Sequence, residues 1–188
     1  KLFAKGNAAK SISWKDACKH LATEPIAVDG EWEQGLSASG TSGVQFTEAE
    51  VDVETGIVRL KRILVVQDCG LVLDKLTAES QIYGGIVGSI NFALYEDRIL
   101  DRVTGQMVNP NMEWYLLAGP SDIPQIDIML MNQPDRGVIG IGEPPTVSTA
   151  SSIANAVRNA TGVTIRSLPL TPQRVLDAIA QEKAGGTL

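Results

Sequence analysis

The alternation of apolar and polar residues at 44–66 constrains the fold of this chain more than any other feature. Apolar residues recur at every second position in "VQFTEAEVDV", with a slip near Thr47, and again in "IVRLKRILVV". A period of two is typical of a β-strand, because successive side chains of a strand point to opposite faces. The residues "ETG" at 54–56 separate the two runs and are typical of a tight turn. The stretch therefore predicts a β-hairpin.

The rest of the chain alternates between helical and strand-like patterns. Ser13 and Thr171 are candidate helix N-caps, and Gly162 suits the end of a helix. Helices are expected at 12–24, 74–97, 144–162 and 171–186, strands at 125–132 and 164–171, loops or short edge strands at 28–43 and 138–143, and a short strand or turn at 101–109. This order predicts an α+β fold, a mixed sheet with packed helices, in which residues 1–188 form a single domain or a domain fragment.

The charge balance and the composition exclude several classes of partner. The net charge is −6, and the 16 Lys and Arg residues are scattered. Nucleic acid and anionic membrane surfaces require clustered Lys and Arg, so neither is an expected partner. The longest uncharged stretch, 80–95, is shorter than the roughly 20 residues of a membrane span. One histidine and two cysteines are too few for a protein-ligated zinc site, so no metal ligand is expected.

The helix predicted at 74–97 contains three glycines, Gly84, Gly85 and Gly88. Each costs about 1 kcal/mol relative to alanine in a helix interior, which indicates that something packs very close to this backbone. Two interpretations remain open, which are close packing within the fold and close approach of a bound cofactor.

Glu143 ends an apolar, glycine-rich approach in "RGVIGIGEPP" (136–145). One interpretation is structural, because the positive end of a helix dipole stabilises a carboxylate just before a helix. The other is chemical, because the glycines let a ligand approach the main chain and the carboxylate can act as a general base. A third interpretation, a hydrolase with Ser148 or Ser151 as nucleophile, lacks a G-x-S-x-G turn and a histidine nearby in sequence.

Four stretches, taken in order, resemble one family. They are "VQDCGLVLD" (66–74), "SQIYGGIVGSINFALYED" (80–97), "RGVIGIGEPPTVSTASSIANAVRNATG" (136–162) and "RSLPLTPQRVLDAI" (166–179). Each motif is modestly specific, and the ordered set is quite specific. The chain resembles the C-terminal part of the molybdopterin-binding subunit of the molybdenum hydroxylases, the xanthine dehydrogenase / aldehyde oxidase family. This resemblance implies the fold of a C-terminal molybdopterin-binding domain.

The resemblance also implies roles for individual residues. Glu143 matches the glutamate of the family's G-x-G-E motif, a general base that accepts a proton as an oxygen from water attacks an electron-poor carbon. The implied substrate is an aldehyde or a nitrogen heterocycle such as a purine. The implied cofactor contacts are Gln81, Gly84 and Gly85 on the pterin side, and Gly140, Ile141 and Gly142 beside the base.

Cofactors and partners follow from the same resemblance. The expected cofactor is molybdenum-molybdopterin or its cytosine dinucleotide form, with iron–sulfur clusters and FAD only on partner domains or subunits. The family's subunit is several times longer and this chain begins with Lys1, so we expect a piece that is active only with the missing part of the subunit. The alternative is a non-catalytic structural or assembly module in which Glu143 only caps a helix. The cytoplasm is the expected compartment, with the periplasm as the alternative.

Overall fold

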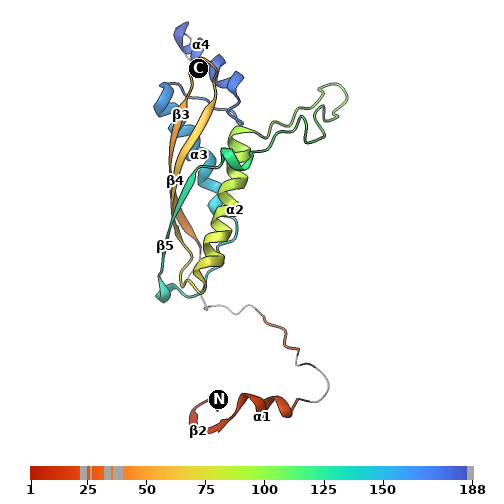
Figure 1. Cartoon of the computed structure of the whole chain (residues 1–188), viewed down its shortest axis with the longest axis vertical. Helices are drawn as coiled ribbons and strands as arrows, with labels where there is room; N and C mark the ends of the chain where they lie inside the picture. The colour runs from red at the N-terminus through yellow and green to blue at the C-terminus, as the bar shows by residue number, and fades with distance from the viewer. Residues whose placement is uncertain (22–24, 26, 32–34, 36–39, 186–188) are drawn as a thin grey trace. The chain divides into compact units, whose positions relative to one another are not determined.

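A computed structural model, drawn in Figure 1, describes residues 1–21, 25, 27–31, 35 and 40–185. Contacts within the chain divide it into two compact units, Lys1–Gln34 and Gly35–Leu188. That both units belong to one domain stays a prediction. The loop or edge predicted at 28–43 lies partly outside the described residues, because 32–34 and 36–39 are not among them.

The first unit is a short hairpin followed by a short helix. Strands β1 (Leu2–Ala4) and β2 (Asn7–Ile12) pair antiparallel. Helix α1 (Trp14–Lys19) begins at the predicted N-cap, where the Ser13 hydroxyl accepts a backbone N–H at 3.1 Å. It ends earlier than predicted, and residues 22–24 lie outside the described residues. None of the described residues of this unit is fully buried. Because neither strand has a buried face, the sequence shows no apolar alternation that would predict this hairpin.

The second unit contains a mixed sheet in the order β3-β4-β5. Strands β3 (Ser42–Val51) and β4 (Val58–Asp68) form the predicted antiparallel hairpin. Strand β5 (Gln125–Met131), predicted at 125–132, pairs parallel to β4. Because β4 and β5 are parallel, their carboxyl ends lie at the same edge of the sheet.

The register of the hairpin decides which side chains of β3 face the core. The register shifts between Glu48 and Ala49, beside the predicted slip, and Lys61 of β4 has no partner on β3. Since the extra residue is on β4, β3 keeps its alternation. The apolar residues before the slip and those after it therefore lie on opposite faces of β3. Val51 packs against the core, whereas Phe46 is 59% exposed.

Three helices lie among the described residues of the second unit. They are α2 (Lys75–Leu94), α3 (Pro145–Thr161) and α4 (Pro172–Lys183), with 3-10 turns η1 (Pro120–Asp122) and η2 (Pro134–Arg136) in the connections. Thr171 and Gly162 cap α4 and α3 as predicted, and Gly162 has a φ of +78°. Figure 1 shows α2 and α3 on the same side of the sheet.

The core lies between the sheet and these helices. Its most buried side chains, each at most 1% exposed, include Ile63 and Val65 of β4, Ile82, Ile86 and Ile90 of α2, and Ile153 and Val157 of α3. Burial of each such side chain contributes about 2 kcal/mol to stability. This packing fixes α2 and α3 against the sheet and so fixes the segments that precede them.

The prediction of a strand at 164–171 is wrong. Residues 164–170 belong to no helix or strand. Pro169 has no N–H to donate to a strand ladder, and the neighbouring Leu170 N–H donates instead to Ala93 O at 2.6 Å. The buried Leu170 side chain explains the apolar pattern, because it belongs to the hydrophobic core without being part of a strand.

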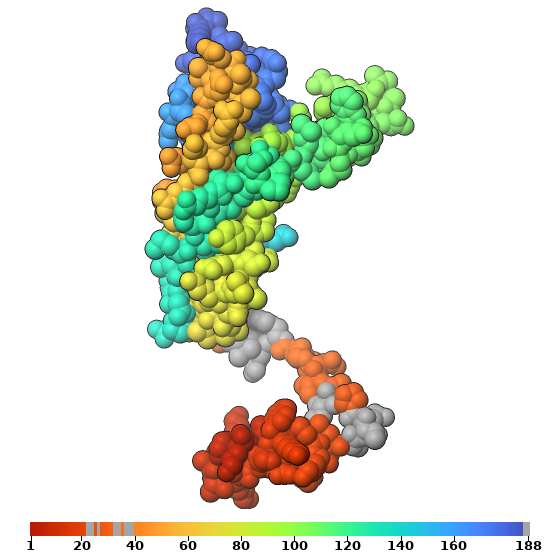
Figure 2. All heavy atoms as spheres, in the orientation of Figure 1, coloured from red at the N-terminus to blue at the C-terminus, as the bar shows by residue number. Residues whose placement is uncertain are grey.

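The segment between α2 and η1 projects from the rest of the second unit (Figure 2). The strand or turn predicted at 101–109 is a turn, with one isolated bridge between Leu100 and Met107. At the base, the buried Asn109 accepts from Ile99 N–H at 3.0 Å and donates to Asp97 O at 2.7 Å. None of the described helices combines the length and the apolar character needed to cross a membrane.

Candidate functional site

The segment 137–144, which carries Glu143, is a loop fastened to the end of β4. Leu71 N–H donates to Gly137 O at 2.9 Å, and Ile139 N–H donates to Cys69 O at 3.3 Å. Gly70 and Val138 form an isolated bridge. A loop or a short edge strand is expected at 138–143, and the structure has a loop there.

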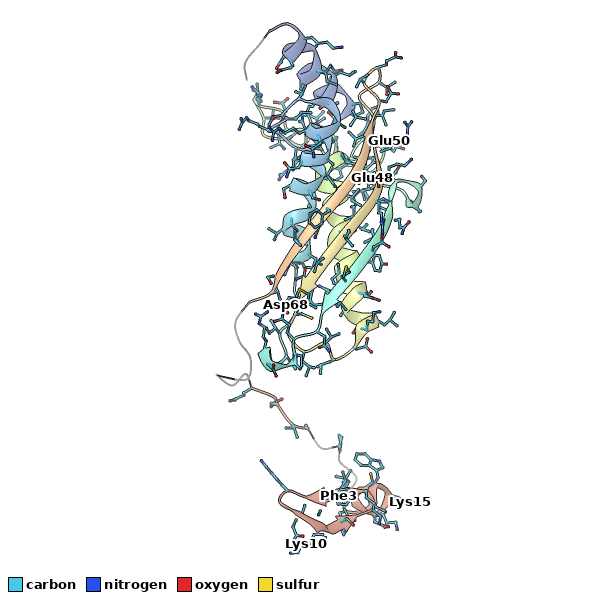
Figure 3. The ribbon with its side chains drawn as sticks, turned by 90° about the vertical axis from the view of Figure 1, so that its left-hand side faces the viewer. Phe3, Lys10, Lys15, Glu48, Glu50 and Asp68 are labelled. Carbon is cyan, nitrogen blue, oxygen red and sulfur yellow. The ribbon has the colours of Figure 1, made fainter. Side chains whose placement is uncertain are left out.

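A buried ion pair anchors the start of this loop. The Arg136 guanidinium pairs with the carboxylate of Asp68, which is 5% exposed and lies at the end of β4 (Figure 3). The second oxygen of Asp68 accepts from Gly70 N–H at 2.8 Å. Arg136 also donates to Gly40 O at 2.8 Å. The pair thus joins β4, the segment before β3 and the loop that carries Glu143.

A close approach of the two loops depends on Gly70. Gly70 has a φ of +69°, and a Cβ there would lie 2.2 Å from Gly137 O. An alanine in the left-handed conformation costs roughly 1–2 kcal/mol. We expect Gly70→Ala to destabilise the protein by more than this, because the carbonyl of Gly137 must also move. The matched control is Gly105→Ala, since Gly105 has a φ of +71° and open space around it. Urea unfolding of both variants measures the difference, and equal losses would contradict the close approach.

Buried polar side chains hold the other end of the loop, where α3 begins. Gln45 of β3 donates to Pro145 O at 2.7 Å and accepts from the Thr149 hydroxyl at 2.5 Å. Ser89 of α2 donates to Thr146 O at 2.8 Å. All three side chains are at most 8% exposed. The loop therefore begins and ends at points fixed by the sheet and by α2.

Glu143 is exposed and its carboxylate does not cap α3. Its backbone oxygen accepts from the N–H and the hydroxyl of Thr146, each at 2.8 Å. The N-cap position is Pro144, which makes no side-chain cap hydrogen bond. Among the described residues, no donor contacts the Glu143 carboxylate. The side chain is thus placed by its backbone and is available to another group.

Gln81 connects α2 to the residue before Glu143. Its side-chain amide donates to Gly142 O at 2.7 Å. Gly142 has a φ of +56°, a left-handed conformation that favours glycine. Ile141 packs against the core and lines, with Gln81 and Gly142, a hollow of about 340 Å³ beside the start of α2.

The glycines of the predicted site fall into two groups. Gly84 and Gly140 have nothing within 4 Å of the position of a Cβ, so their backbone is open to another molecule. Gly85 is different, because a Cβ there would lie 3.0 Å from Pro145 Cβ and 3.4 Å from Thr146. The two interpretations of the helical glycines therefore apply to different residues. Gly85 allows close packing of α3 within the fold, and Gly84 faces open space that a bound cofactor could approach.

No set of three or more His, Cys, Asp and Glu side chains could hold a metal ion in the part of the chain that the structure describes. Cys69 is buried, and burial raises the pKa of its thiol. Its thiolate form is therefore disfavoured, which makes Cys69 unsuited to act as a nucleophile or metal ligand.

Sequence reasoning did not include in the site the residues that fasten the loop. Asp68 and Arg136 are far apart in the sequence, and their pairing needs the carboxyl end of β4 to meet η2. Gln45 stands between Val44 and Phe46, so its burial looks unfavourable in the sequence. A polar residue at an inward position of a strand is the one signal that could have found it.

Comparison with known proteins matches this chain to proteins that bind a molybdenum cofactor. A family model described as the molybdopterin cofactor-binding domain matches residues 1–124. The matched residues include Gln81, Gly84 and Gly85 and end before the loop that carries Glu143.

Two similar relatives come from Escherichia coli strain K12. The putative xanthine dehydrogenase molybdenum-binding subunit is 40% identical over 139 residues, covering 72% of this chain and 18% of that protein. The aldehyde oxidoreductase molybdenum-binding subunit is 34% identical over 139 residues, covering 71% of this chain and 19% of that protein. This chain therefore spans less than a fifth of the length of these relatives.

A solved structure, the aldehyde oxidoreductase from Desulfovibrio gigas, matches with a TM-score of 0.67. It is 33% identical, over 74% of this chain and 15% of that chain. The quinoline 2-oxidoreductase from Pseudomonas putida 86 matches with a TM-score of 0.66 at 31% identity, over 71% of this chain and 18% of that chain. Both matches confirm the predicted α+β fold. The chain belongs to the xanthine dehydrogenase / aldehyde oxidase family of molybdenum hydroxylases and matches its molybdopterin-binding subunit.

Proposed function

We propose that this chain forms the base-bearing part of a molybdenum hydroxylase that oxidises an aldehyde or an electron-poor nitrogen heterocycle with oxygen from water. Glu143 is the proposed general base. The observation that carries the proposal is the state of its carboxylate, which is exposed, has no donor among the described residues and does not cap α3. The loop behind it is fastened at both ends, as a base held in one position requires.

The residues around Glu143 fit a large planar cofactor. Gly84 and Gly140 leave open space over their backbones, and Gln81 keeps its carbonyl oxygen while its amide binds Gly142. We propose that Gln81, Gly84 and Gly85 lie on the pterin side and that Gly140, Ile141 and Gly142 lie beside the base. The cofactor is molybdopterin or its cytosine dinucleotide form. When bound, it supplies the activated oxygen and accepts the electrons of the substrate.

The chain's own residues would then orient the reacting groups and move a proton. Glu143 takes up the proton that is released as the oxygen attacks the substrate carbon. Gln81 holds the Gly142 carbonyl, and the left-handed Gly142 sets the direction in which Glu143 leaves the loop. The remaining part of the molybdenum subunit, and iron–sulfur and flavin partners, would complete the enzyme.

Metal analysis of the native protein tests this proposal. We expect the protein purified from its source to contain molybdenum and pterin. We also expect the rest of the molybdenum subunit to be present, so that the peptides found cover a sequence several times longer than this chain. Plasma mass spectrometry measures the metal, and peptide mass spectrometry identifies the polypeptides. A native protein without molybdenum or pterin would favour the non-catalytic assembly module instead.

Gly84→Ala tests the proposed approach of the pterin to α2. Gly84 and Gly88 lie one turn apart on α2, and both face open space. Alanine should therefore stabilise the helix at either position, by up to about 1 kcal/mol. We expect Gly84→Ala to reduce molybdenum per protein several-fold and the control Gly88→Ala to leave it unchanged. Equal molybdenum contents in the two variants would place the pterin away from Gly84.

A further inference from the structure

Within the second unit, the described residues leave one face of the sheet uncovered. Among the described elements, α2 and α3 pack on one face, and Figure 3 looks onto the other. The half of this face nearest Asp68 is apolar across all three strands. We name it the open apolar face; it consists of Val44, Phe46, Leu64, Val66, Met129 and Met131. Four of these side chains are between 46% and 59% exposed, namely Val44, Phe46, Met129 and Met131.

The apolar pattern of β4 indicates that this face is covered in the functional protein. Strand β4 contains the uninterrupted apolar run Ile63–Val66, in which Ile63 and Val65 are completely buried under the helices. Leu64 and Val66 alternate with them on the other face. A strand that is apolar on both faces is typical of burial on both faces.

The other half of the same face suits water. Strand β3 places Glu48 and Glu50 there, at the end away from Asp68 (Figure 3). Lys61 pairs with Glu50 at 3.4 Å, and Arg62 pairs with Asp127. Glu50 and Asp127 are thus neutralised within the sheet, so a partner need not bring cations to pair with them. The partner that fits the open apolar face is therefore an apolar layer, such as a helix or sheet face, that ends near Arg62 and Asp127.

We propose that the open apolar face packs against the part of the molybdenum subunit that lies outside this chain. The proposal rests on the proposed function, because it takes the chain as one part of that subunit. Its relatives extend far beyond the match, which covers 18% and 19% of their lengths. The face also borders the buried pair of Asp68 and Arg136, where the loop of Glu143 begins. A layer fixed there permanently would hold the base-bearing loop against the remainder of the catalytic subunit.

Methionine oxidation in the native protein tests the proposal without any substitution. Hydrogen peroxide converts accessible methionines to sulfoxides, and Met129 and Met131 both belong to the open apolar face. We expect both to be oxidised at least about ten-fold more slowly in the native protein than in the same protein unfolded in urea. Peptide mass spectrometry measures the rates. Equal rates in the native and unfolded protein would overturn the proposal.

Separation of the subunits identifies the occupant. Protection of Met129 and Met131 should persist in the molybdenum subunit after iron–sulfur and flavin subunits are removed, and after dilution to a monomer. Loss of protection on subunit removal, or on dilution, would assign the face to another subunit or to a second copy and overturn the proposal. Phe46→Asp should raise the oxidation rate of Met129 at least about five-fold, whereas the control Glu48→Asp on the charged half should not.

The outcomes for the interface and for the function are separate. A protein that contains molybdenum but leaves Met129 and Met131 unprotected contradicts the interface alone. A protein that protects both methionines but contains no molybdenum contradicts the proposed function alone.

Discussion

On the proposed function, we expect Glu143→Gln to lower kcat of the complete protein by at least about 100-fold, while molybdenum and pterin stay bound. Glutamine has the size of glutamate but cannot take up a proton at neutral pH, and general-base catalysis contributes about 100- to 10,000-fold. Because the Glu143 carboxylate contacts no donor among the described residues, its loss leaves no protein group unpaired. Turnover of a panel of aldehydes, purines and quinolines with a dye as electron acceptor measures the effect.

Two controls make this result specific. Glu54→Gln changes an exposed glutamate in the turn of the β3–β4 hairpin and should leave kcat unchanged. Molybdenum and pterin contents of both variants show whether the cofactor remains. Full activity in Glu143→Gln would exclude Glu143 as the base, and loss of the cofactor would give it a binding role instead.

Local signals in the sequence predicted the elements of the second unit better than their arrangement. The hairpin of β3 and β4, the N-cap Thr171 and the C-cap Gly162 depend on neighbouring residues, and the structure confirms all three. The parallel pairing of β4 with β5 joins segments that are far apart in the chain, and no local pattern encodes it. The wrong strand at 164–171 has the same origin, because an apolar alternation does not say against which element it packs.

The candidate site shows the same division between local and distant information. The resemblance to the family made Glu143, Gln81 and the glycines candidates on the basis of short motifs. The structure adds what those motifs cannot contain, such as the hydrogen bond from Gln81 to Gly142 and the contact of Gly85 with α3. Whether a glycine faces open space or a packed helix depends on the position of another element, so Gly84 and Gly85 look alike in sequence.

Arg136→Met should loosen the loop that carries Glu143. The variant leaves the carboxylate of Asp68 buried without its cation, and the loss of one partner of a buried ion pair costs about 3 kcal/mol. We expect hydrogen exchange at the amides of Leu71 and Ile139 to become about 100-fold faster, because these amides join the loop to the end of β4. Mass spectrometry of the native protein in deuterated water measures the change. The amide of Gly105, in the distant turn, serves as the internal reference.

The control for this prediction is a second Arg–Asp pair, which lies between strands β4 and β5. Arg62 and Asp127 are more exposed, at 55% and 32%, and an exposed pair contributes at most about 1 kcal/mol. Arg62→Met should therefore change exchange at Leu71 and Ile139 by less than about five-fold. The double variant Asp68→Asn with Arg136→Met removes both charges and should restore much of the protection, because no buried charge is then left alone. If Arg136→Met exchanged no faster than Arg62→Met, the ion pair would not be what holds the loop, and the position of Glu143 would depend on Gln45, Gln81 and Ser89 instead.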